Sequence, residues 1–107
     1  MLVIDPPIHP GEILREEFMQ PLKLSAGKIA KAVGVPRTRI ERLAREETGL
    51  TADTAARLGR YFRTGTAFWL NIRDSYELSV ASLDEALASA LDAIEPLDRP
   101  DLESEAA

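Results

Sequence analysis

The chain has 107 residues and a formal net charge of −5, with 45% apolar and 29% charged residues, as in an ordinary single-domain globular protein. It has no cysteine and one histidine, which excludes disulfides and thiolate metal sites and argues against a zinc site. It shows neither the basic start of a signal peptide nor the roughly 20 apolar residues of a membrane span, so we expect a cytoplasmic protein that contacts no membrane.

The apolar pattern predicts five helices and no strand, so the expected fold class is all-α. The first helix runs from about Pro10 to Met19, and Pro21 ends it because a proline disfavours helical backbone in the residue before it. Ser25 is suited to cap a second helix that extends through Ala32. Gly34 can adopt the left-handed backbone that closes this helix.

The third helix is expected from Pro36 to about Glu46, because the fixed φ angle of proline suits the first turn of a helix. Thr51 caps a fourth helix that ends near Phe62. A long fifth helix is expected from Thr66 to about Ile94, ahead of Pro96. The apolar residues expected in the core are Ile29, Val33, Val35, Ile40, Leu43, Leu58 and Phe62.

Charge is distributed unevenly along the chain. Residues 1–80 carry 12 basic and 10 acidic side chains, whereas residues 81–107 carry one basic and eight acidic ones. Basic side chains outnumber acidic ones by 10 to 4 within residues 23–63. We therefore divide the chain into a domain, residues 1–80, and a C-terminal helix extension with an acidic tail, residues 81–107. Local charge indicates what a surface binds, and the domain carries a basic field.

The third helix carries four arginines within nine residues. They are Arg37, Arg39, Arg42 and Arg45. At about 100° per residue, Ile40, Leu43 and Ala44 share one side of this helix and form its buried stripe. Arg42 and Arg45 lie opposite the stripe together with Thr38, and the other two arginines flank them.

Such a basic face has two interpretations. One is a solvated helix surface with ion pairs between residues four apart, such as Glu41 and Arg45. The other is DNA binding, because a short helix, a Gly-Val turn and a second, basic helix form a helix-turn-helix, whose second helix enters the major groove. Arginine suits that role since its planar fork can donate two hydrogen bonds to guanine O6 and N7. Lys28 and Lys31 on the preceding helix would then contact phosphates.

Four segments of the chain carry a family resemblance: HPGEILREEFMQPL, LSAGKIAKAVGVPRTRI, LTADTAARLGRYF and FWLNIRDSYEL. Together they resemble the HigA/VapI antitoxins of type II toxin–antitoxin modules, which belong to the phage-repressor-like (XRE) helix-turn-helix class. The resemblance covers about residues 8–80. It implies a bacterial homodimer that binds double-stranded operator DNA, represses its own operon and neutralises a cognate, basic HigB/RelE-like ribonuclease toxin.

The resemblance also assigns DNA-contacting residues. The recognition helix corresponds to Pro36–Glu46, with its base-reading residues in the first turn and Arg42 one turn later. The capping serine of the second helix lies where a hydroxyl and a backbone amide meet a phosphate. With Lys28 and Arg45 added from the helix geometry, the predicted DNA-binding residues are Ser25, Lys28, Arg37, Thr38, Arg39, Arg42 and Arg45.

Two departures from the family pattern weaken the case for tight DNA binding. Ala26 stands where many members have a glutamine that often touches DNA, and Gly27 where a larger residue is usual. After the recognition helix, Glu46-Glu47-Thr48-Gly49 replaces an Asn-Gly-Lys-Arg turn and puts negative charge near the phosphates. These departures motivate one alternative, an interaction-only antitoxin that has lost DNA binding. A helix-turn-helix repressor without a toxin partner is the other alternative, although FWLNIRDSYEL resembles the antitoxin branch and argues against it.

The sequence predicts no enzyme, and no cofactor, metal or small-molecule substrate. Glu12, Glu16 and Glu17 have no accompanying nucleophile, glycine-rich loop or second histidine, so a solvated face is favoured over acid–base chemistry. His9 is expected to be a capping or surface residue. The aromatic and apolar residues expected to pack in the fifth helix are Phe68, Trp69, Ile72 and Tyr76, although Trp69 is equally suited to anchor a dimer.

The end of the predicted fifth helix has an apolar stripe of its own. It comprises Leu83, Leu87, Ala90, Leu91 and Ile94, and acidic residues lie opposite it. The stripe either folds back on the domain or contacts a partner, which would be a second subunit or the basic toxin. Apart from this stripe, we expect the homodimer interface to be formed mainly by the fourth and fifth predicted helices.

Overall fold

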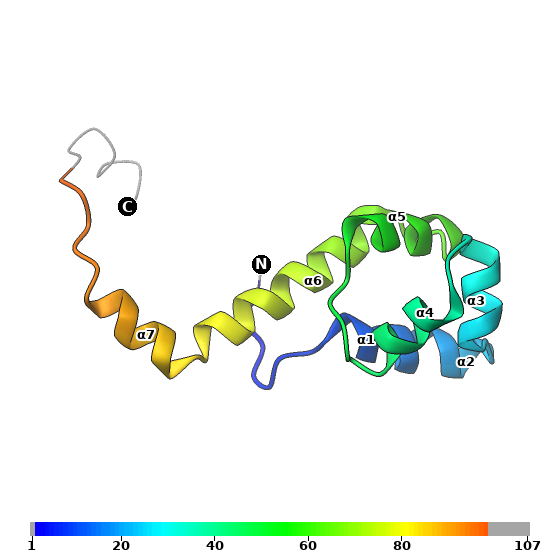
Figure 1. Cartoon of the computed structure of the whole chain (residues 1–107), viewed down its shortest axis with the longest axis horizontal. Coiled ribbons are helices and arrows are strands. Elements are labelled where there is room, and N and C mark those ends of the chain that lie inside the picture. Colours follow the sequence, from blue (N-terminus) through cyan, green and yellow to red (C-terminus); the bar gives the residue numbers. More distant parts are fainter. Residues whose placement is uncertain (1, 99–107) are drawn as a thin grey trace.

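A computed structural model of the protein describes residues 2–98, which are helical and contain no strand (Figure 1). The first helical rod comprises α1 (Pro10–Ile13), the π-helical segment η1 (Leu14–Met19) and α2 (Gln20–Leu22). The helices that follow are α3 (Ala26–Val33), α4 (Arg37–Ala44), α5 (Ala52–Tyr61), α6 (Thr66–Ser82) and α7 (Glu85–Asp92). None of the helices in these residues is long and apolar enough to cross a bilayer. Beyond Asp98, the predicted acidic tail lies outside the described residues.

The first rod begins where the sequence predicts but continues further. His9 caps it, because its Nδ1 atom accepts a hydrogen bond from the amide of Gly11 at 2.8 Å. The predicted end before Pro21 is wrong, since helical backbone runs to Leu22 and closes at Lys23 with a φ of 54°. Pro21 is tolerated because the rod changes there from π to α geometry, where the regular hydrogen-bond ladder is already interrupted.

Helices α3 and α4 form the predicted helix-turn-helix. Ser25 caps α3 by accepting a hydrogen bond from the amide of Lys28 at 3.1 Å, and Gly34 closes it with a φ of 75°. Both capping predictions are confirmed. Pro36 has extended backbone and precedes α4 instead of starting it. Helix α4 ends at Ala44, two residues before the predicted end.

The predicted single helix from Thr66 to Ile94 is wrong, and the five-helix count with it. Helix α6 ends at Ser82, and α7 begins after Leu83 and Asp84. Asp84 causes the break, because its Oδ1 atom accepts a hydrogen bond from the amide of Leu87 at 3.1 Å and so caps a new helix. The apolar spacing continues across this break, which is why the pattern alone does not reveal it.

The core lies between the first rod, α3, α4, α5 and the start of α6. Its buried apolar residues are Leu14, Ile29, Ala30, Ile40, Leu43, Ala44, Leu50, Ala55, Leu58 and Trp69. Ile29, Ile40, Leu43 and Leu58 are buried as predicted, whereas Val33, Val35 and Phe62 are half-buried and pack against the core. Trp69 is fully buried, with its ring centre 5.2 Å from that of Phe18, so it packs in the core and is not a surface anchor.

The second half of α6 leaves the globular body, and α7 lies at its far end (Figure 1). The N-terminal segment runs beside α6, where the amide of Ile4 donates to Oγ of Ser79 at 2.8 Å. Every residue of α7 is exposed, as are residues 80–83 before it. The described chain is therefore elongated, with principal extents of 53, 27 and 22 Å.

Candidate nucleic-acid interface

The residues predicted to contact DNA all have exposed side chains. They belong to α3, α4 and the residues that cap these helices, and they are Ser25, Lys28, Arg37, Thr38, Arg39, Arg42 and Arg45. On the opposite side of α4, Ile40, Leu43 and Ala44 are buried, as the apolar stripe predicts. The exposed side of α4 is therefore basic and free of large apolar side chains.

Arg37, the first residue of α4, lies against the first turn of α3. A Cβ atom placed on Gly27 would be 3.2 Å from Cδ of Arg37, so the glycine leaves the room that this side chain occupies. Nε of Arg37 lies 3.6 Å from Oε1 of Glu41, one turn further along α4. The ion pair between Glu41 and Arg45 that illustrates the solvated-face interpretation does not form, because Arg45 lies beyond the last helical residue and Glu41 pairs with Arg37 instead.

Arg39 is held by α5. Its Nη1 atom donates to Oδ2 of Asp53 at 3.0 Å, and Nε of Arg57 donates to the same oxygen at 2.9 Å. Arg57 also donates from Nη1 to the backbone carbonyl oxygens of Val33 at 2.7 Å and Gly34 at 3.3 Å, at the end of α3. One carboxylate and one guanidinium therefore join α4 to α5 and to the turn of the helix-turn-helix.

Arg42 and Arg45 are less constrained. Within residues 2–98 neither side chain makes an ion pair. Arg42 lies in the last turn of α4, where a cation also interacts favourably with the helix dipole. Both cations are available to an anionic partner without breaking an existing pair.

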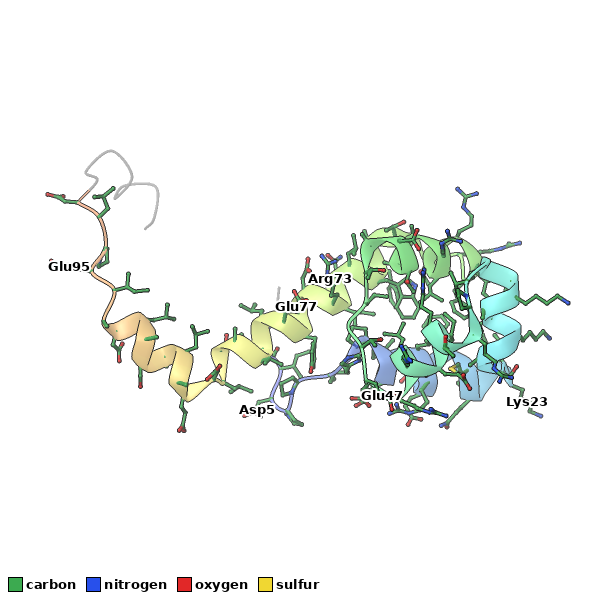
Figure 2. The ribbon with its side chains drawn as sticks, in the orientation of Figure 1. Asp5, Lys23, Glu47, Arg73, Glu77 and Glu95 are labelled. Atoms are coloured by element: carbon green, nitrogen blue, oxygen red, sulfur yellow. The ribbon has the colours of Figure 1, made fainter. Side chains whose placement is uncertain are left out.

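The C-terminal end of α4 is held by Arg15 from η1. Nη1 of Arg15 donates to the carbonyl oxygen of Ala44, and Nη2 donates to Oε2 of Glu46 at 3.2 Å. Desolvation opposes the charge on Arg15, but hydrogen bonds to Glu46 and Glu16 outweigh it and raise its pKa. The negative charge of Glu46 is thus balanced by an arginine, whereas Glu47 makes no ion pair among the described residues (Figure 2).

Arg15, Asp53 and Arg57 are not identified as functional residues from the sequence, although all three contact α4 or the turn before it. Asp53 and Arg57 are four residues apart on one helix with the acid first, a spacing that favours an ion pair and is visible in the sequence. Their link to Arg39 depends on how α4 packs against α5. That packing has no signature in residue spacing.

The protein was compared with known sequences and structures. It is 51% identical to virulence-associated protein I of Dichelobacter nodosus over 80 residues. This match covers 75% of this chain and 74% of that protein. It is similar to the structure of Pseudomonas aeruginosa antitoxin HigA with the higBA promoter, at 42% identity and a TM-score of 0.77, covering 85% of this chain and 98% of the other.

The structure of antitoxin GraA in complex with its operator is also similar, at 36% identity and a TM-score of 0.79, covering 87% of this chain and 93% of the other. No protein-family model matches the chain. The similarity to HigA and GraA extends over most of both chains. The chain therefore belongs to the HigA/VapI-type antitoxins of the XRE helix-turn-helix family.

Proposed function

We propose that the protein is an antitoxin that binds operator DNA as a homodimer, represses its own operon and neutralises a cognate HigB/RelE-like toxin. The observation that carries the DNA-binding part is the exposed basic side of α4 directly after a capped helix and a tight turn. In this arrangement the second helix enters the major groove. Relatives of this chain are solved with a promoter and with an operator.

Each residue of the interface has a role in this proposal. Arg37, Thr38 and Arg39 in the first turn of α4 face base edges, with Arg42 one turn later. Ser25 and Lys28 at the start of α3, and Arg45 after α4, contact phosphates. The pairing of Glu46 with Arg15 removes one objection to DNA binding, because it balances a negative charge beside the interface. This favours a DNA-binding antitoxin over an interaction-only one.

Alanine variants of the α4 arginines test the DNA-binding part. Arg37→Ala, Arg39→Ala and Arg42→Ala should each weaken binding to the upstream region of the gene in gel-shift titrations at two salt concentrations. Loss of a base-reading arginine should cost about 1–3 kcal/mol and relax the preference at one operator position, whereas loss of a phosphate contact should weaken binding to all sequences alike and lower the salt slope by about one unit. Arg60→Ala on α5, outside the proposed DNA-binding and dimer surfaces, is the control and should bind as the parent does. If all three variants bind like the parent, α4 is only a solvated face.

The dimer is proposed to form along α6. Phe68, Leu78 and Val80 on α6, and Leu83 after it, are exposed apolar side chains, and a cavity of about 280 Å³ lies between residues 4–13 and this helix. Residues 66–83 carry one basic and two acidic side chains, so two copies would pair with little repulsion. The sequence predicts a dimer that involves both the fourth and the fifth predicted helices. The large apolar side chains of α5, the fourth of these, point into the core, so of the two only α6 offers apolar side chains to a second copy.

Helix α7 is proposed to bind the toxin. Its exposed apolar residues are continued by Ile94, and residues 84–98 carry five acidic side chains and no basic one. Two copies of this segment would repel each other, whereas a basic protein would be attracted to it. Figure 2 shows Glu95 at the opposite end of the molecule from Lys23, so a toxin bound there leaves α4 open.

The toxin proposal is tested by looking for a short, basic reading frame beside this gene and expressing its product. Co-expression of the full chain should restore growth that this product arrests, and a variant carrying Leu87→Lys and Leu91→Lys should not. The control is operator binding, which both changes should leave intact because α7 is remote from α4. A neighbourhood without such a frame would favour the repressor without a toxin partner.

A further inference from the structure

The hydrogen bonds around Asp53 restrict a residue of the proposed DNA-reading surface. Arg39 has five N–H groups, and Asp53 accepts one of them, at Nη1, which leaves the remaining donors of the fork free. Asp53 is itself fixed by Arg57, which donates to the same carboxylate oxygen and to the backbone carbonyl oxygens that end α3. Arg39 is thus oriented through a chain of contacts that ends on the backbone of the helix-turn-helix.

Stability does not explain this arrangement. The side chains of Arg39, Asp53 and Arg57 are 46%, 57% and 41% exposed, and ion pairs at such exposure contribute little to folding. A carboxylate beside a DNA-binding surface also repels phosphates. It lowers the affinity for DNA of any sequence, so it is useful only if it improves discrimination.

We propose that Asp53 is a positioning residue that holds Arg39 in a base-reading orientation and keeps it from phosphates, so that the pair sets the operator preference of the protein. An arginine that is oriented before binding loses less conformational freedom when it contacts a base. To reach a phosphate instead, Arg39 would have to give up its bond to Asp53, whose carboxylate would then keep only Arg57 as a partner. The inference rests on the proposed operator binding and adds the residue that controls its specificity.

Asp53→Asn tests this inference, because asparagine keeps the shape of the side chain and removes its charge. Binding of the full chain is measured by fluorescence anisotropy on the operator and on a random-sequence duplex at several salt concentrations. Affinity for random DNA should rise, and its salt slope should steepen by about one unit, because Arg39 becomes free to contact a phosphate. The ratio of operator to random affinity should fall about tenfold, the loss expected when one base contact is no longer enforced.

Two further variants make the result specific. Asp92→Asn removes an exposed carboxylate on α7, which is remote from α4, and should leave the affinity ratio unchanged. In an Arg39→Ala background, Asp53→Asn should change the ratio no further, because the group it positions is gone. Thermal unfolding of Asp53→Asn should match that of the parent.

The possible outcomes separate the inference from the proposed function. If Asp53→Asn changes operator and random affinity by the same factor, the carboxylate acts only as a general charge and the inference is overturned. If the ratio falls equally in the Arg39→Ala background, Asp53 does not act through Arg39, and the inference is likewise overturned. If the parent itself does not prefer the operator, the proposed function fails, and the inference fails with it.

Discussion

Gly27 shows how one missing side chain shapes the candidate interface. It lies in the first turn of α3, and the stem of Arg37 occupies the space beside it, with Cδ and Cγ at 3.2 and 3.8 Å from where a Cβ would be. A larger residue at this position would compete with Arg37 for that space. Gly27 and Arg37 therefore form a matched pair.

Substitutions of Gly27 should separate stability from DNA binding. Gly27→Ala should stabilise the protein by up to about 1 kcal/mol in urea unfolding, because alanine favours helix over glycine and the stem of Arg37 can shift by a few tenths of an ångström. Gly27→Leu should displace Arg37 and weaken operator binding several-fold. Gly49→Ala is the control, since its Cβ would have open space. Unchanged operator affinity in Gly27→Leu would contradict the proposed role of Arg37.

At the scale of elements, α4 is positioned from both ends. Asp53 on α5 holds Arg39 near its start, and Arg15 on η1 binds the carbonyl of Ala44 at its end. The first rod also approaches α4 closely, because a Cβ on Gly11 would collide with the carbonyl oxygen of Leu43. The orientation of the recognition helix is thus determined by neighbours on two sides.

Replacing Arg15 should reveal this support. Arg15→Met keeps the apolar stem but leaves the carbonyl of Ala44 and the carboxylate of Glu46 without their donor. We expect the free energy of unfolding in urea to fall by about 1 kcal/mol. The expected loss is small for a hydrogen bond to a charged group, because the Arg15 side chain is one-third exposed and solvent screens it. Operator affinity should also fall, since Glu46 regains an unbalanced charge beside the DNA. Arg60 on α5 makes no ion pair among residues 2–98, so Arg60→Met should change neither quantity. An Arg15→Met protein as stable as the parent would contradict this account.

The predictability of these elements from sequence depends on how local their causes are. The caps at Ser25 and Thr51 and the closing turn at Gly34 are correctly predicted, because each depends on a few consecutive residues. The break at Asp84 is equally local, but a continuing apolar stripe conceals it. The buried side of α4 follows from periodicity. The contacts of Arg39 with Asp53 and of Arg15 with Ala44 join residues 14 and 29 positions apart, and no periodic pattern encodes them.

At the scale of the whole molecule, α6 connects a compact body to an exposed helix. Its exposed apolar residues, Phe68, Leu78 and Val80, stay in contact with water if the chain remains a monomer. A homodimer along α6 would cover them and place two recognition helices about one DNA turn, roughly 34 Å, apart.

Charge placed on this helix should break the dimer. Leu78→Glu combined with Val80→Glu should give a monomeric mass by light scattering at micromolar concentration, where the parent should be dimeric. Both side chains are exposed, so the domain should still fold, with an unchanged helical circular dichroism spectrum. Operator affinity should fall steeply because each half-site would then bind alone. A monomeric parent, with or without operator, would contradict the proposed dimer.

The break at Leu83 and Asp84 also bears on how such a protein can evolve. Residues 84–98 are exposed and contribute nothing to the buried core, so substitution, deletion or exchange of this segment leaves the folding of the domain unaffected. The α4 surface is under separate constraints, imposed by α5 and η1 within the body. Under the proposed roles, the choice of DNA site and the choice of toxin can therefore diverge independently between related bacteria, and mismatched pairs can arise by recombination at a single junction.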